Sequence, residues 1–436
     1  MKGQNLYRQA KKIIPGGTQL LSKRPELFLP GQWPAYYSHA SGVEVTDLDD
    51  NTYVDMSIMG VGACILGYAD PDVDNAAHQA VSRGVQCTLN CPEEVELAQL
   101  LCELHPWASM VRYVRSGGEA VSVAVRIARA HTRKDIVAFC GYHGWTDWYL
   151  AANLGDATAL DGHLMPGLPP AGVPRGLKGS ALPFHYNQLD ELTSVVEQHG
   201  GELAAIVMEP RRGAAPEPGF LEGVREIADD TGAVLVFDEI TTGFRMRAGG
   251  IHMCHSVMPD IAVLAKAMSN GYAMAAVIGK DDVMDSTQRT FVSSTNWTER
   301  IGPSTALATI HKYRENRTEK HICRIGSNVM EGWQKAAHEV GLRIHTSGLP
   351  SLNHFSFDSP DSSLLSTLFT QRMLERGFLA YTQFKPSWAH SDKHVDDYLM
   401  ACKSVFSELA RVEEEGTLAD HLLGAPQKGG FYRLTD

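Results

Sequence analysis

Apolar runs alternate with helical patterns along most of the chain. Six runs are apolar at nearly every position, and segments with apolar residues at helical spacing separate them. The runs are "MVRYV", "IVAF", "LAAIVM", "AVLVF", "DIAVL" and "MAAVIG", beginning at residues 110, 136, 203, 233, 260 and 274. Strands without an inside-outside alternation are typical of a sheet covered on both faces. The pattern predicts an α/β fold with its ligand site at the carboxyl ends of the strands.

The alternation breaks down in two places, which suggests how the chain is organised. Residues 151–185 are rich in Gly, Pro and Ala, and a loop of this length is typical of a lid or binding loop that orders around a ligand. After about residue 310, long helical stretches surround short strands. We therefore expect a large domain over residues 51–310. Residues 311–436, with residues 1–50 packed against them, are expected to form a smaller α+β domain.

Composition excludes several classes of protein. Apolar residues make up 44% of the chain and charged residues 21%, which is typical of a globular protein. The net charge of −12, without a basic run, argues against nucleic-acid binding. Neither a signal peptide nor a membrane span is evident. The eight Cys lack CxxC spacing and the His lack an HExxH pair, so we expect a cytoplasmic protein with reduced thiols and no metal site.

The stretch "RSGGEA" follows the first apolar run and precedes a helical pattern. Ser116 and Glu119 have the spacing of a capping box. Gly117 and Gly118 would let a ligand approach the backbone closely, and the start of a helix binds anions such as phosphate. An ordinary capped helix is the alternative interpretation.

Three other apolar runs end in side chains that could carry chemistry. Asp238 ends the run at 233, Tyr142 and His143 follow the run at 136, and Lys266 follows the run at 260. Taken singly, these residues could be a paired core acid, core aromatic residues and a solvent-reaching amine. Together with the phosphate cradle, they supply the ring partner, ring stacker and amine that pyridoxal 5′-phosphate (PLP) requires.

The spacing of these pieces resembles one enzyme family. "FDEITTGFR", followed by Lys266 28 residues after Asp238 with "PDI" between them, resembles the class III aminotransferases. The resemblance covers residues 10–425. It is nearest the glutamate-1-semialdehyde 2,1-aminomutase branch, through "IPGG", "ILGYADP", "GLPPAGVP", "VMEP" and "TGFR". It implies the fold-type I PLP-dependent transferase fold, a mostly parallel central sheet with helices on both faces plus a smaller α+β domain.

The resemblance also implies roles for particular residues. Lys266 would be the catalytic Schiff-base lysine, and Asp238 would be the catalytic partner of the pyridine nitrogen. The other residues implied to bind the cofactor are Ser116, Gly117, Gly118, Tyr142, His143, Glu209 and Thr298. Thr298 would reach the phosphate from the neighbouring subunit, which implies a homodimer with shared active sites.

The chain departs from the family pattern at three points. Gly118 replaces the usual Ser or Thr of the phosphate cradle. Leu20 and Lys23 stand where the aminomutases have a Ser and a carboxylate-binding Arg, and Lys385 replaces an acid in "TQFKPSW". Lys does not reproduce the bidentate grip of Arg on a carboxylate. We therefore expect a substrate other than glutamate 1-semialdehyde, with Lys23 and Lys385 facing an anionic or sugar-like compound. The alternative is that both lysines are surface residues.

Three functions fit the sequence. The first is an aminotransferase that moves an amino group between a small-molecule amino donor and a ketone or aldehyde acceptor. The second is an aminomutase or epimerase that uses the same cofactor without a second substrate. The third is a catalytically silent PLP-fold binding protein, for which we would expect a degenerate Lys266 or Asp238.

Overall fold

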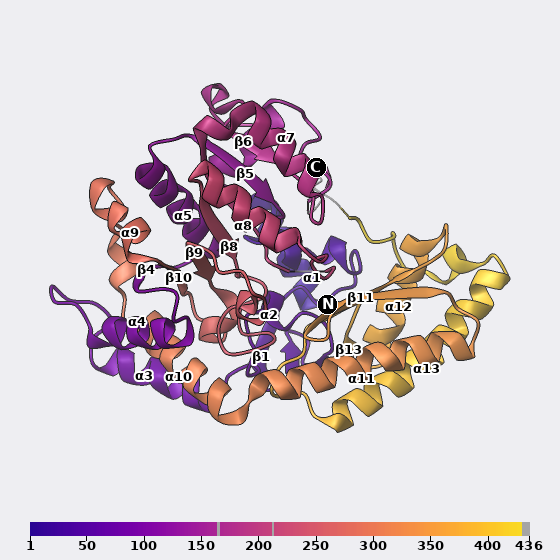
Figure 1. The fold of residues 1–436 in the computed structure, drawn as a ribbon. Helices are drawn as coiled ribbons and strands as arrows, with labels where there is room; N and C mark the ends of the chain where they lie inside the picture. Colours follow the sequence, from indigo (N-terminus) through magenta and orange to yellow (C-terminus); the bar gives the residue numbers. More distant parts are fainter. Residues whose placement is uncertain (164–165, 212, 430–436) are drawn as a thin grey trace. The chain divides into compact units, whose positions relative to one another are not determined.

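The computed structural model describes residues 1–163, 166–211 and 213–429, and these divide into two compact units. The large unit comprises Pro71–Arg314. The small unit combines Met1–Asp70 with the described residues from Glu315 onward (Figure 1). The small unit therefore also contains residues 51–70, which the sequence had assigned to the large domain.

A seven-stranded sheet forms the centre of the large unit, in the order β4-β10-β9-β8-β7-β5-β6. Its strands are β4 (Met110–Val114), β5 (Ile136–Cys140), β6 (Ala181–Pro183), β7 (Leu203–Met208), β8 (Val234–Asp238), β9 (Ile261–Leu264) and β10 (Ala275–Gly279). Strands β5 to β9 pair in parallel, and β10 runs antiparallel to both β4 and β9. The prediction of a mostly parallel sheet is confirmed.

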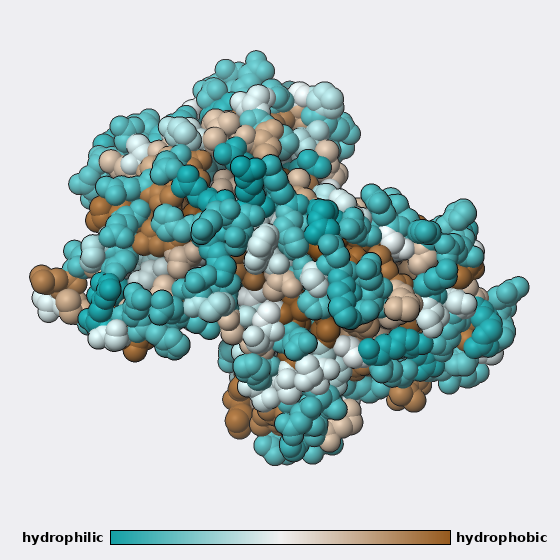
Figure 2. All heavy atoms as spheres, turned by 90° about the horizontal axis from the view of Figure 1, so that it is seen from below, coloured by the Kyte–Doolittle hydropathy of each residue, from teal (hydrophilic) through white to brown (hydrophobic). Residues whose placement is uncertain are grey.

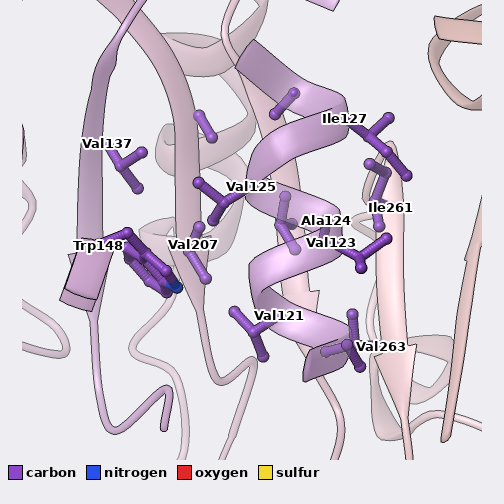
Figure 3. Packing of buried hydrophobic residues seen from close by; sticks show 14 of the residues in the cluster. Val121, Val123, Ala124, Val125, Ile127, Val137, Trp148, Val207, Ile261 and Val263 are labelled. Atoms are coloured by element: carbon purple, nitrogen blue, oxygen red, sulfur yellow. The ribbon is translucent and has the colours of Figure 1, made fainter. Parts of the chain in front are cut away.

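The large unit also contains α-helices, several of which pack against this sheet. They are α3 (Pro71–Ser82), α4 (Pro92–Leu104), α5 (Gly117–Thr132), α6 (Asp147–Leu150), α7 (Leu189–His199), α8 (Phe220–Thr231), α9 (Asp281–Met284) and α10 (Ile301–Asn316). The apolar face of α5 packs across the strands, as Figure 3 shows for Val121 and Val125 beside Val207 and Val263. Burial of this face, rather than helix propensity alone, stabilises α5. Helices α7 and α8 contact β5, β7 and β8.

Residues 151–185 are attached to the large unit at several points. Leu160 and Val173 are buried in the same core cluster as α5. Near the segment's end, β6 extends the sheet by pairing with β5. Residues 164 and 165 lie outside the described residues. The buried anchors restrict any lid movement to the stretches between them.

The small unit contains two sheets, in the orders β1-β2-β3-β13 and β11-β12-β14. The strands are β1 (Tyr37–Ser41), β2 (Glu44–Asp47), β3 (Thr52–Asp55), β11 (Ile344–Leu349), β12 (Leu352–Phe357), β13 (Phe378–Leu379) and β14 (Gln383–Phe384). Its helices are α1 (Lys2–Ile13), α2 (Met59–Gly62), α11 (Thr318–Glu339), α12 (Ser362–Glu375) and α13 (Asp392–Glu414). Because β3 pairs in parallel with β13, the segment after residue 50 belongs with the C-terminal part.

The surface gives no sign of a membrane-spanning segment. Within the described ranges, every helix is too short or too polar to cross a bilayer. Hydrophilic side chains cover most of the face in Figure 2, and hydrophobic ones gather in separate patches.

Candidate active site

Four strands of the large unit end in side chains of the predicted site. Strands β5, β7, β8 and β9 are neighbours in the sheet and run in parallel, so their carboxyl ends lie at one edge. His143 follows β5, Glu209 follows β7, Asp238 ends β8, and Lys266 follows β9. This edge is where ligands bind in open α/β sheets.

Asp238 is buried, with 3% of its surface exposed, and is fixed by two neighbours. Its Oδ1 accepts a hydrogen bond from the Ile240 backbone N–H at 3.0 Å. Its Oδ2 lies 2.8 Å from Nδ1 of the buried His143. His143 Nε2 lies 3.0 Å from the Cys140 carbonyl, which can only accept. The contacts with Ile240 and His143 leave lone pairs on the Asp238 oxygens for a further donor.

Lys266 has an unusual backbone conformation and a defined side-chain contact. Its φ is +49°, in the left-handed region that residues other than glycine rarely adopt. Such strain persists where surrounding structure enforces it, commonly at functional sites. The Lys266 Nζ donates a hydrogen bond to Thr241 Oγ1 at 2.9 Å. Thr241 lies in the turn after β8, so this contact joins the ends of two adjacent strands.

The start of α5 has free hydrogen-bond donors. Ser116 is its N-cap and forms the expected capping box with Glu119. No described residue accepts a hydrogen bond from the backbone N–H of Gly117 or Gly118. A Cβ on Gly117 would lie 2.8 Å from Ile240 Cδ1, so that position has no room for a side chain. The helix start is thus bare backbone suited to an anion.

Tyr142 and Glu209 sit beside the end of β5. The Tyr142 ring is partly exposed and meets the Tyr149 ring edge-on at 5.8 Å between centroids. Glu209 is buried over Gly141, where an added Cβ would lie 2.9 Å from Glu209 Oε2. Gly141 has a φ of +110°, which glycine adopts readily. Its lack of a side chain also leaves room for the Glu209 carboxylate.

A buried network beside Asp238 was not found from the sequence. Glu239 Oε1 accepts hydrogen bonds from the His252 backbone N–H and from His252 Nδ1, both at 2.8 Å, and Thr242 donates to Oε2. Burial raises the pKa of Glu239, but the hydrogen bonds from His252 and Thr242 outweigh it and lower the pKa overall. The Trp107 indole N–H donates to His252 Nε2 at 2.9 Å, which fixes the neutral His252 tautomer. The network links distant segments, and the only hint in the sequence was the second acid after Asp238.

Of the remaining predicted residues, Thr298 belongs to the large unit, whereas Lys23 and Lys385 belong to the small unit. Thr298 is exposed, donates to the Thr295 carbonyl at 3.0 Å and accepts from Gln86 Nε2 at 3.3 Å. Lys23 is exposed and ends a short 3-10 turn of the small unit. Lys385 is half-buried there, and its backbone N–H donates to the Ser57 carbonyl at 2.7 Å.

Comparison with known proteins identifies the family. The family model "Aminotransferase class-III" matches residues 30–405. The chain belongs to the class III aminotransferases. This class III aminotransferase is a PLP-dependent enzyme with the fold-type I architecture, as the resemblance in its sequence implied.

Curated relatives and a solved structure match nearly the whole chain. The chain is 30% identical to a 3-aminobutyryl-CoA aminotransferase of Cloacimonas acidaminovorans over 95% of its length and 98% of the relative's. It is 32% identical to a glutamate-1-semialdehyde 2,1-aminomutase of Roseiflexus castenholzii, covering 95% and 99%. The fold is similar to the PLP-bound FumI protein of Sphingopyxis sp. MTA144, with a TM-score of 0.85, 24% identity and coverage of 94% and 97%.

The chemical groups at this edge of the large unit fit those of PLP. The bare start of α5 offers backbone N–H groups to a phosphate. Asp238 offers a buried carboxylate with spare lone pairs, and Lys266 offers an amine at the same edge of the sheet. The cofactor therefore has chemically matched residues for its phosphate, its ring nitrogen and its aldehyde.

Proposed function

We propose that this enzyme transfers an amino group between an amino donor and a ketone or aldehyde acceptor, using Lys266 and Asp238 as catalytic residues. The observation that supports this most strongly is the buried Asp238, held by His143 at the sheet edge from which Lys266 emerges. The carboxylate of Asp238 keeps lone pairs beyond its contacts with His143 and Ile240, and the protonated ring nitrogen of PLP would supply a cationic donor to it.

The other residues of the large unit would hold the cofactor. Gly117 and Gly118 would donate backbone N–H groups to the phosphate, with Ser116 capping the helix that presents them. Tyr142 would stack on the ring, with His143 beside it. Glu209 would face the pocket from the end of β7.

The chemistry of these residues follows from charge and position. When bound, PLP supplies an electron sink for breaking a bond next to the substrate nitrogen. Asp238 would keep the ring nitrogen protonated, because a close opposite charge favours the charged form. Lys266 Nζ would hold the cofactor covalently and, once released, take and return the proton at the substrate carbon. Thr241 Oγ1 offers that amine a resting hydrogen bond.

We propose that Lys23 and Lys385 favour an anionic or sugar-like substrate over glutamate 1-semialdehyde. The support is the exchange of the Arg and the acid of the aminomutase pattern for two amines. The two curated relatives differ in their named reactions, so their likeness supports shared chemistry rather than one substrate. Turnover of glutamate 1-semialdehyde to 5-aminolevulinate at an ordinary enzymatic rate would contradict this proposal.

Measurement of a half-reaction distinguishes the aminotransferase from the aminomutase or epimerase and from the silent binding protein. The holoenzyme is given an amino donor alone, and its absorbance is followed. An aminotransferase accumulates the pyridoxamine form, which an added keto or aldehyde acceptor converts back. An aminomutase or epimerase completes its turnover with a single substrate and needs no acceptor. A protein that never takes up a coloured cofactor supports the silent binding protein.

We also propose a homodimer in which Thr298 reaches the phosphate of the neighbouring subunit. Two surface segments carry large exposed apolar side chains, Leu89 (79% exposed) and Phe291 (85% exposed). The segments are tied together through Gln86, whose amide donates to the Thr295 carbonyl at 2.7 Å. Contiguous exposed apolar surface marks subunit interfaces, so we expect the partner subunit to cover these two side chains.

Mixing two inactive variants tests the shared site. A Lys266→Ala protomer keeps Thr298, and a Thr298→Ala protomer keeps Lys266. In a mixed dimer, one of the two sites would then combine an intact Lys266 with an intact Thr298. We expect mixing to restore tight PLP binding at that site, with a dimer mass by sedimentation. A monomer, or no gain on mixing, would contradict the proposal.

A further inference from the structure

Trp145 lies against the start of α5, at a position where Gly118 has no side chain. Its indole Nε1 is 3.3 Å, and its Cδ1 3.4 Å, from the point that a Cβ on Gly118 would occupy. The N–H edge of the indole therefore faces the helix start. The side chain is 71% exposed, and no described residue accepts a hydrogen bond from its N–H.

Contacts on both sides of Trp145 attach its loop to α5. A Cβ on Gly144 would lie 3.2 Å from Gly118 Cα, and Gly144 has a φ of +102°, so the loop approaches the helix as bare backbone. On the other side, Thr146 Oγ1 and Ser122 Oγ of α5 are 2.8 Å apart. Trp148 is buried in the α5 core cluster. The loop carrying Trp145 is thus attached to the helix before and after it.

The two positions are sterically coupled. A Cβ at 3.3 Å from the indole is tighter than most real contacts, so the indole would have to shift by a few tenths of an ångström to admit a side chain at residue 118. At this point of the helix start, a bound phosphate would meet either a side chain on residue 118 or the indole edge of Trp145. In this chain residue 118 is glycine, so the group at this point is the indole.

We propose that the Trp145 indole N–H donates a hydrogen bond to the phosphate of PLP, in the place of the hydroxyl that residue 118 lacks. This inference rests on the proposed function, in which the start of α5 holds that phosphate. An indole N–H can only donate, which suits a phosphate oxygen, and hydrogen bonds to charged groups are the stronger kind.

The test compares PLP with pyridoxal, which lacks the phosphate, as ligands of the apoenzyme. Trp145→Phe keeps the aromatic ring and removes the donor. We expect it to raise the dissociation constant of PLP about tenfold or more, the usual effect of losing a hydrogen bond to a charged group. The dissociation constant of pyridoxal should not change. Trp388→Phe, an indole of the small unit, is the matched control and should change neither value.

A second variant separates a lost donor from a damaged fold. Adding Gly118→Ser to Trp145→Phe supplies a hydroxyl where the smaller ring leaves room, and should restore most of the PLP affinity. Gly118→Ser alone should weaken PLP binding, because it crowds the indole. Unchanged PLP affinity in Trp145→Phe, equal losses for PLP and pyridoxal, or failure of the added serine to rescue would each overturn the inference.

A second experiment, borohydride reduction, distinguishes failure of this inference from failure of the proposed function on which it rests. Borohydride reduction of the wild-type holoenzyme should leave the cofactor attached to Lys266. Without that adduct, the proposed function fails and this inference fails with it. With the adduct present and Trp145→Phe behaving as wild type, only the role of Trp145 is overturned.

Discussion

At the scale of single residues, the contacts that hold Asp238 and Lys266 differ, and each set suits the proposed catalytic role of its residue. Asp238 is buried and held by contacts with Ile240 and His143, so its carboxylate has little freedom to turn. Lys266 has a strained backbone, and its amine rests on Thr241. The acid is thus fixed, whereas the amine has a contact that it can leave.

Replacing Asp238 with Asn should leave the cofactor attached to Lys266 but slow its chemistry. An uncharged amide does not stabilise the protonated form of the PLP ring nitrogen, so the ring would accept electrons from the substrate less readily. We expect the rate of the half-reaction with an amino donor to fall on the order of 10²-fold or more, the usual effect of removing one preorganised electrostatic group. Stopped-flow absorbance measures this rate. Asp238→Glu, which keeps the charge, is the control, and equal rates for Asn and wild type would contradict the role.

Thr241→Val should change the chemistry of Lys266 without changing cofactor affinity. Valine keeps the shape and removes the oxygen that accepts the hydrogen bond from Nζ. Losing one such bond has a net effect of about 1 kcal/mol, so we expect a severalfold change in the single-turnover rate. Thr241→Ser keeps the oxygen and should behave as wild type. If Val and Ser have the same effect, the hydroxyl has no role in positioning Lys266.

At the scale of elements, the sequence predicted the strands that carry the site. The six apolar runs correspond to β4, β5, β7, β8, β9 and β10, because strands covered on both faces are continuously apolar. It did not predict β6, a three-residue strand inside the Gly- and Pro-rich segment. Strand β6 depends on pairing with β5, which local patterning cannot reveal.

The same distinction applies to the site. Asp238 and Lys266 could be found because a charged residue directly after an apolar run is conspicuous. Thr241 and Trp145 could not, since their importance depends on contacts with segments distant in the sequence, β9 and α5. The sequence suggested a missing hydroxyl at Gly118, and only the packing around it suggested a replacement.

The cap of α5 should contribute to stability independently of catalysis. Ser116→Ala removes the oxygen that receives the Glu119 N–H. We expect the unfolding free energy of the apoenzyme to fall by about 1 kcal/mol, measured by denaturant titration. Ser116→Thr keeps a capping oxygen and should restore most of this loss. No difference between Ala and Thr would mean that the capping box adds no stability.

At the scale of the whole molecule, both units contain histidines whose pKa is lowered, and these should make stability depend on pH. Burial lowers the pKa of His105 and His163 in the large unit, and of His390 in the small unit, to about 4. Unfolding returns each to its ordinary value near 6.5. Between these values the unfolded chain binds more protons than the folded one, so stability falls as pH drops from 6.5 to 4.

Thermal unfolding across this range checks the prediction for one histidine at a time. His390→Asn should flatten the dependence on pH in the small unit, because it removes one group that must stay neutral when folded. His345→Asn replaces an exposed histidine of the small unit and should leave the slope unchanged. Unfolding temperatures that stay constant or rise as pH falls from 6.5 to 4 would contradict the proposed contribution.

The most direct test of the central claim is to locate the cofactor on the chain. The purified holoenzyme is reduced with borohydride, digested, and its peptides are mapped by mass spectrometry. We predict a single phosphopyridoxyl group on Lys266, lost when an amino donor is added before reduction. A label on another lysine, or no label on a coloured holoenzyme, would contradict the assignment of Lys266 and the mechanism built on it.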